Sequence, residues 1–128
     1  MFPTASPITS ITRTIRDYVD DALNAMSKAR RYLQNVSYED FLKNDEKQDA
    51  TVRVIEVIGE AVGNIPQQIQ EKYPDVPWRD IIGMRNKIAH EYFGVDFETV
   101  WKVVKEDIPA VQPLFEKLKQ DYIRENEE

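Results

Sequence analysis

The chain has no cysteine, a single histidine and no long uninterrupted hydrophobic run. Without cysteine it can form no disulfide framework and no thiolate metal site, and one imidazole is too few for a histidine-rich metal cluster. We therefore expect no metal ion and no other cofactor. The opening residues, MFPTASPITS, lack the apolar segment of a signal peptide, and no stretch is apolar enough to span a bilayer. We expect a cytoplasmic protein without a membrane partner.

The composition indicates one domain. A chain of 128 residues, of which 41% are hydrophobic, can build one core but not two. We expect a flexible leader over residues 1–13, a single helical domain over residues 14–123 and a frayed polar tail over residues 124–128. The net charge of -6 argues against nonspecific binding of nucleic acid, because affinity for a phosphate backbone comes largely from clustered lysine and arginine. A local basic cleft remains compatible with that sum.

Helices are the only regular structure that the sequence predicts. The chain has only four glycines, its apolar residues recur at spacings of three and four, and no segment is predicted as a strand. We expect a first helix over residues 14–36, a short second helix over 37–44 and a long third helix that Pro66 must end or kink. Gly59 and Gly63 in this third helix indicate that another helix approaches closely.

The second half of the chain predicts two further helices. Trp78 opens a helix of about fourteen residues that closes before Gly94. Asp96 caps a last helix, which is bent or broken near Pro109 and Pro113. Long antiparallel helices closed by shorter ones give an all-α, up-and-down bundle of four or five helices.

Arg85 is an anomaly in the helix that begins at Trp78. On a helical wheel it falls among the apolar residues of one side, Trp78, Ile81, Ile82, Ile88, Ala89 and Tyr92. A guanidinium there must reach solvent or be paired, because an unpaired buried charge costs several kcal/mol. One interpretation is therefore a structural ion pair with Glu56 or Glu60 of the third helix.

Asn86, His90 and Tyr92 accompany Arg85 near the end of that helix. His90 follows Asn86 by four residues and Tyr92 follows Arg85 by seven, so a continuous helix brings all four side chains to one patch. Such a patch suits metal-independent cleavage of RNA. Histidine, with a pKa of about 6.5, can take the proton of a ribose 2′-hydroxyl, and arginine can hold the phosphate oxygens. The structural alternatives are a histidine that caps the helix and a tyrosine at the rim of the core.

The segment RNKIAHEY, residues 85–92, resembles the R-x4-H-x-Y signature of the HepT family of HEPN ribonuclease toxins, which are partners of minimal nucleotidyltransferase (MNT) antitoxins. The similarity extends over roughly residues 14–120. Within it, IRDYVDDALNAM resembles the opening helix of the family, YEDFLKND its short connector and VIEVIGEAVGNIP its glycine-containing middle helix. The stretch from YPDVPW to VVKEDIP then follows the family pattern.

This resemblance implies a HEPN-type bundle and a homodimer, in which two copies of the motif face each other and form one composite, metal-independent RNase site. Arg85 and His90 are then the catalytic pair, and Asn86 positions the RNA substrate or the histidine. A dimer also answers the objection from net charge, because two Arg85 side chains make a basic cleft in an acidic protein. Further positive charge can come from Arg79, Lys87 or Lys102, which are candidate helpers in the cleft.

For Tyr92 the resemblance implies regulation. The cognate MNT antitoxin transfers AMP to the motif tyrosine (AMPylation), which adds bulk and about one negative charge where RNA phosphate must sit. Another possible role for Tyr92 is to stack on a base of single-stranded RNA. The leading hypothesis is thus an endoribonuclease toxin of a toxin–antitoxin pair. The alternatives are a non-catalytic, nucleotide-binding HEPN subunit that partners a nucleotidyltransferase, and a structural helical dimer anchored by an Arg85 ion pair.

Overall fold

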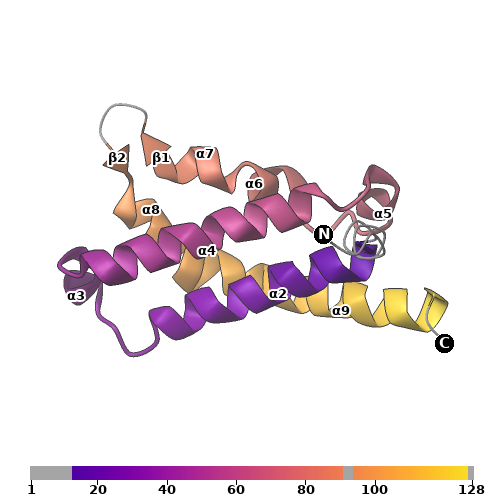
Figure 1. Cartoon of the computed structure of the whole chain (residues 1–128), viewed down its shortest axis with the longest axis horizontal. Helices are drawn as coiled ribbons and strands as arrows, with labels where there is room; N and C mark the ends of the chain where they lie inside the picture. Colours follow the sequence, from indigo (N-terminus) through magenta and orange to yellow (C-terminus); the bar gives the residue numbers. More distant parts are fainter. Residues whose placement is uncertain (1–12, 91–93, 127–128) are drawn as a thin grey trace, which may run out of the picture.

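The computed structural model describes residues 13–90 and 94–126, and of Ala89 and His90 the backbone only. Four helical segments run along the length of the molecule and alternate in direction (Figure 1). They are α2 (Ile15–Tyr32), α4 (Asp45–Gly63), the pair α6 (Trp78–Ile82) and α7 (Met84–Ile88), and α9 (Ile108–Asn126). The predicted all-α, up-and-down antiparallel bundle is confirmed.

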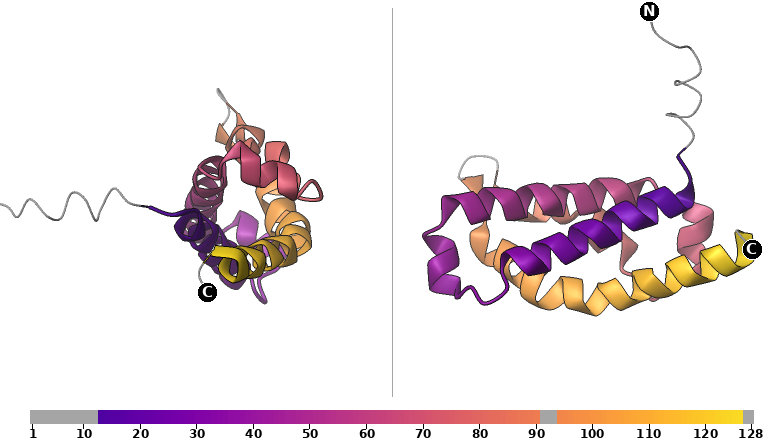
Figure 2. Two further views of the ribbon diagram at one scale, coloured as in Figure 1. Left: turned by 90° about the vertical axis from the view of Figure 1, so that its right-hand side faces the viewer. Right: turned by 60° about the horizontal axis from the view of Figure 1, so that its bottom comes forward.

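Shorter elements join these segments at the two ends of the bundle. α3 (Tyr38–Leu42) connects α2 to α4 at one end, and α5 (Gln67–Lys72) follows α4 at the other end (Figure 1). A hairpin of two short antiparallel strands, β1 (Ala89–His90) and β2 (Gly94–Val95), lies toward the end that holds α3. Viewed end-on, the helices surround one interior (Figure 2).

The interior is filled by the apolar stripes of the long helices. Buried side chains of α2, α4 and α9 meet there, and they include Ala22, Met26, Ile55, Ile58, Val62, Ile108, Val111, Phe115 and Leu118. Each stripe has the helical spacing that the sequence shows. No helix in the described part of the chain is long and apolar enough to cross a membrane.

Capping side chains fix where the helices begin. Thr14 forms a capping box with Asp17, whose amide donates to the threonine hydroxyl while its carboxylate accepts from the Thr14 amide. Ser37 accepts from the amide of Asp40 and opens α3 as expected. α2 ends at Tyr32, four residues before the predicted position, because the chain turns through Asn35 with a positive φ of 61°.

Gly59 and Gly63 differ in what surrounds them. A Cβ atom on Gly59 would lie 3.6 Å from the carbonyl oxygens of both Ile81 and Ile82, so α6 packs directly on the backbone of α4 at this point. A Cβ atom on Gly63 would meet nothing within 4 Å, and that residue is exposed. The predicted close approach is therefore confirmed for Gly59 and wrong for Gly63. Pro66 separates α4 from α5, as predicted.

The predicted long helix from Trp78 is wrong in two respects. It is interrupted at Gly83, whose amide closes the last turn of α6 with a 2.9 Å hydrogen bond to the Arg79 carbonyl. A Cβ atom there would make a tight contact of 3.1 Å with that same oxygen. α7 then ends at Ile88, and the chain enters β1 although no strand was predicted. Pairing of Ala89 with Val95 replaces further helical hydrogen bonds.

The last helical segment changes its pitch before its prolines. α8 (Phe97–Lys102) continues into a π-helical turn, η1 (Val103–Asp107), in which the Ile108 amide bonds to the carbonyl of Val103. This wider turn comes immediately before Pro109, which has no amide hydrogen and whose ring would crowd the carbonyl four residues earlier. The predicted irregularity near Pro109 is therefore confirmed, whereas α9 continues through Pro113 without a break.

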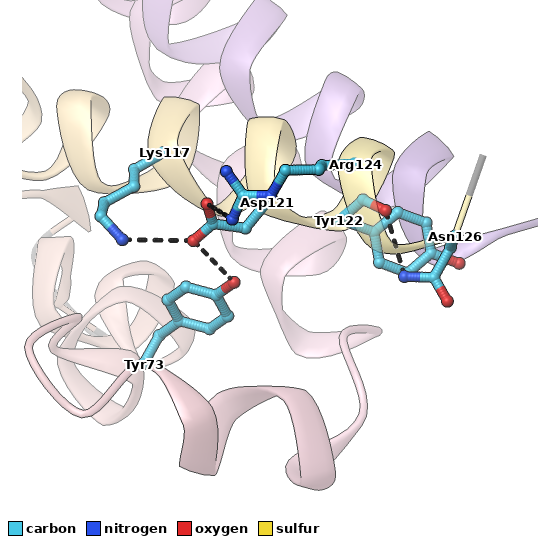
Figure 3. Close-up of polar contacts among 6 residues, drawn as sticks. All are labelled: Tyr73, Lys117, Asp121, Tyr122, Arg124 and Asn126. Atoms are coloured by element: carbon cyan, nitrogen blue, oxygen red, sulfur yellow. Dashed lines mark hydrogen bonds and ion pairs between the residues drawn. The ribbon is translucent and has the colours of Figure 1, made fainter. Parts of the chain in front are cut away.

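The segment between α5 and α6 is tied to α9 by a polar contact. Tyr73 points toward Asp121, and its hydroxyl donates a 3.1 Å hydrogen bond to that carboxylate (Figure 3). Asp121 also accepts from Lys117 at 3.2 Å and from Arg124 at 3.0 Å. The indole of Trp78 donates to the Tyr73 carbonyl, so this contact helps to position the start of α6.

Candidate functional site

Arg85 lies on α7 with its side chain exposed to solvent. The proposed ion pair with Glu56 or Glu60 does not form, because both carboxylates face Arg53 at 3.7 and 3.9 Å. Within residues 13–90 and 94–126, no carboxylate pairs with Arg85. Its charge is therefore not neutralised by a described partner. The exposed position also avoids the cost of burying a guanidinium.

The two residues after Arg85 face different surroundings. Asn86 is exposed, like Arg85. Lys87 lines a hollow of about 230 Å³ between α6–α7 and the η1–α9 segment, where Asp80 and Asp107 also lie. Lys87, one of the residues expected to add positive charge to the cleft, therefore shares this hollow with two aspartates. Arg79 on α6 and Lys102 at the end of α8 are both exposed.

His90 is the second residue after α7 and lies in β1, where it pairs with Gly94 of β2. The expected helical relation between Asn86 and His90 does not hold, because α7 ends at Ile88. The side chain of His90 and the whole of Tyr92 lie outside the described residues. The structure therefore brings Arg85 and Asn86 together on α7 and sets the His90 backbone two residues beyond its end.

The hairpin that contains His90 is held by backbone hydrogen bonds at its base. The amide of Asp96 donates to the carbonyl oxygen of Ile88 at 2.7 Å. Gly94 has φ of 85°, a left-handed conformation that favours glycine. The GVD sequence was a signal for this turn, since glycine followed by a helix cap marks a change of direction. From the sequence alone Asp96 is predicted only as a cap, because its contact with Ile88 joins residues that no local pattern relates.

Asp96 also fixes the first turn of α8. Its carboxylate accepts a hydrogen bond from the Thr99 amide at 3.2 Å and from the Thr99 hydroxyl at 2.7 Å. One residue thus begins α8 and closes the hairpin.

Nowhere in residues 13–88 and 94–126 do three His, Cys, Asp or Glu side chains gather closely enough to hold a metal ion.

The chain matches one family of known proteins. A family model described as Ribonuclease HepT-like matches residues 22–118. A protein of Thermococcus cleftensis named "Probable ribonuclease HepT" is 42% identical over 108 residues, which cover 84% of this chain and 98% of that protein. "Putative RNase MJ1216" of Methanocaldococcus jannaschii is 44% identical over 109 residues, which cover 85% of this chain and 90% of that protein. No solved structure shows a significant match.

Proposed function

Because the chain belongs to the family of HepT-like ribonucleases, we propose that it is a metal-independent endoribonuclease whose reaction is carried out by Arg85 and His90. The observation that carries the proposal is the RNKIAHEY motif, whose residues 85–90 lie at the junction of α7 and β1, with Arg85 exposed on the helix. An exposed guanidinium that no described carboxylate neutralises is available to bind an RNA phosphate.

The proposed reaction uses the RNA's own hydroxyl as nucleophile. The neutral imidazole of His90 takes the proton of the ribose 2′-hydroxyl, and the 2′-oxygen attacks the adjacent phosphorus. The bond from phosphorus to the 5′-oxygen breaks, that oxygen leaves as a hydroxyl with a proton from water, and the His90 imidazolium returns its proton to the solvent. The products are a 2′,3′-cyclic phosphate and a 5′-hydroxyl end. Arg85 stabilises the added negative charge on the phosphate oxygens, and Asn86 positions the substrate or the histidine.

The proposed active form is a homodimer with one composite cleft. Two copies of Arg85 in one cleft would concentrate positive charge in a chain whose net charge is -6. Ile82, which lies three residues before Arg85, is 40% exposed. An interface between two copies at the motif would remove this apolar side chain from water.

The proposed biological role is that of a toxin whose antitoxin is an MNT-type nucleotidyltransferase. The partner would transfer AMP from ATP to the phenol oxygen of Tyr92 and release pyrophosphate. The attached nucleotide would block the cleft by its bulk and by its negative charge, which repels an RNA phosphate. Family membership and the motif tyrosine, two residues after His90, support this role.

Growth inhibition on expression tests the toxin role. Wild-type protein, produced without a nucleotidyltransferase, is expected to stop growth, whereas Arg85→Ala and His90→Ala are expected to permit it. Lys72→Ala is the matched control, since Lys72 is exposed on α5 at the other end of the bundle. Growth arrest by either motif variant at equal protein level would overturn the proposed roles of these residues. Co-expression of a cognate nucleotidyltransferase should restore growth and add the mass of AMP to the wild type but not to Tyr92→Phe.

A further inference from the structure

A groove rich in positive charge lies where the end of α2 passes η1 and the start of α9. Its volume is about 570 Å³, and its charged lining residues are Arg30, Arg31 and Lys105. The other lining residues are Ser27, Gln34, Asn35, Val104, Pro109 and Gln112, so no carboxylate lines it. This is unusual in a chain with 23 acidic and 17 basic residues.

The cations of the groove are held by neutral partners. Arg30 donates to the side-chain oxygen of Gln112 at 2.9 Å, and the amide nitrogen of Gln112 donates to the Ser27 hydroxyl at 3.0 Å. Lys105 donates to the backbone carbonyl of Leu33 at 2.8 Å. None of these contacts neutralises a charge, so the positive potential of the groove is retained.

Interaction with the dipole at the C-terminus of α2 accounts for only part of the positive charge in the groove. Arg30 and Arg31 lie in the last turn of α2, where cations interact favourably with the helix dipole. The C-terminus of a helix carries about half of one negative charge. Three positive side chains therefore exceed what the helix end can offset, and Lys105 comes from a different element, η1.

We propose that this groove binds the phosphate backbone of RNA, as a contact separate from the Arg85 and His90 motif. The inference rests on the proposed ribonuclease function, because it extends the surface that holds the same substrate. No aromatic side chain lines the groove, which suits a backbone better than a stacked base. The C-terminal end of α2 and the hairpin lie toward the same end of the bundle (Figures 1 and 2), so one RNA chain can reach both.

Binding of a labelled single-stranded RNA of about 30 nucleotides tests the groove. All proteins carry His90→Ala, so that the RNA is not cleaved and affinity is measured apart from catalysis. The test variant is Arg30→Gln with Arg31→Gln, and the matched control is Lys28→Gln with Lys72→Gln, which removes the same charge from exposed positions outside the groove. Lys105 is left intact because its bond to Leu33 supports the end of α2.

The test variant is expected to bind RNA roughly 10- to 30-fold more weakly than the control at 0.1 M salt, since each neutralised phosphate contributes a log–log salt slope of about 0.7. Its salt slope should fall by about 1.4, because two contacts of about 0.7 each are removed. Arg30→Lys with Arg31→Lys, which keeps the charge, should retain most of the affinity. Equal affinity and slope in test and control variants would overturn the proposal, as would equal weakening by the lysine variant, which implies lost structure instead of lost charge.

The outcome is distinguishable from a failure of the ribonuclease proposal. If protein with an intact His90 cleaves RNA but the groove variant binds like its control, only the groove assignment fails. If the groove variant loses affinity although the protein with His90 intact never cleaves, the groove stands as an RNA-binding surface and the ribonuclease assignment fails.

Discussion

The amide of Asp96 donates a 2.7 Å hydrogen bond to the carbonyl of Ile88, which joins the first turn of α8 to the last residue of α7. Between these two residues lies the hairpin that carries His90. The Asp96 carboxylate caps α8 through Thr99. The position of the motif histidine therefore depends on a helix cap outside the motif.

Replacement of Asp96 by alanine should lower both stability and RNA cleavage. Loss of an N-cap costs about 1 kcal/mol, and a frayed start of α8 loosens the base of the hairpin. Asn44→Ala is the control, because Asn44 caps α4 through the Lys47 amide at 3.0 Å. Chemical denaturation and cleavage assays should show similar destabilisation in both variants but reduced activity only in Asp96→Ala. Equal cleavage by the two variants would contradict a positioning role for Asp96.

Substitutions at Gly59 should depend steeply on side-chain size. Alanine fits, because its Cβ atom would make ordinary contacts of 3.6 Å with the Ile81 and Ile82 carbonyls, and it should stabilise α4 by up to about 1 kcal/mol. Leucine must displace α6 and should destabilise the fold by about 1–3 kcal/mol. Urea unfolding measures both effects, with Gly63→Leu as control at an open, exposed site. A Gly59→Leu protein as stable as wild type would show that α6 does not pack on this site.

Acid should weaken the tie between Asp121 and its partners. The hydrogen bond from Lys117 is the largest cause that lowers the pKa of Asp121 below its ordinary value of 3.8, and the hydrogen bond from Tyr73 adds to it against the opposing effect of burial. A lowered folded-state pKa means that the stabilisation is complete above the unfolded-state pKa and is lost as the pH falls through the folded-state value. The gap in melting temperature between wild type and Asp121→Asn should therefore be full at about pH 7 and shrink in acid.

Asp49→Asn is a suitable comparison for this pH series, because Asp49 is exposed on α4. Its melting temperature should follow that of the wild type across the series. A gap for Asp121→Asn that stays constant down to about pH 2 would show that ionisation of Asp121 does not stabilise the fold.

Charge at Ile82 should disrupt the proposed homodimer. Ile82→Glu places a carboxylate three residues before Arg85, at a side chain that is 40% exposed, and should shift the protein toward monomer with loss of RNA cleavage. Leu42→Glu, at an α3 side chain that is 45% exposed, is the control and should leave the dimer intact. Analytical ultracentrifugation over a range of concentrations gives the result. A dimer of unchanged affinity in Ile82→Glu would place the interface elsewhere.

Local sequence signals predicted the long elements well. The stripes of α2, α4 and α9, the caps at Ser37 and Asp96 and the break at Pro66 all follow from side-chain chemistry within one or two helical turns. The R-x4-H-x-Y motif likewise identified the family. These features depend on neighbours in the sequence, which a single sequence displays.

The region around the motif was predicted less well, because long-range contacts decide it. RNKIAH has ordinary helical residues, yet α7 ends at Ile88. The carbonyl oxygen of Ile88 accepts a hydrogen bond from the amide of Asp96. Gly83 ends α6 as its C-cap, although the spacing of apolar residues continues through it. The π-helical turn before Pro109 shifts the register of apolar residues, and the groove at Arg30 and Arg31 joins elements far apart in the chain. Neither feature appears in a helical wheel.

Cleavage of single-stranded RNA in excess EDTA tests directly whether the protein is a metal-independent ribonuclease that uses Arg85 and His90. The assay compares unmodified wild type with Arg85→Ala and His90→Ala, and it identifies the ends of the products. Because Arg85 is exposed, its replacement should change stability by less than about 0.5 kcal/mol, while cleavage should fall about 10²- to 10³-fold. Wild type should leave 2′,3′-cyclic phosphate ends, and His90→Ala should give almost no product. Cleavage by His90→Ala at the wild-type rate, or no cleavage by wild type free of AMP on Tyr92, would contradict the proposal.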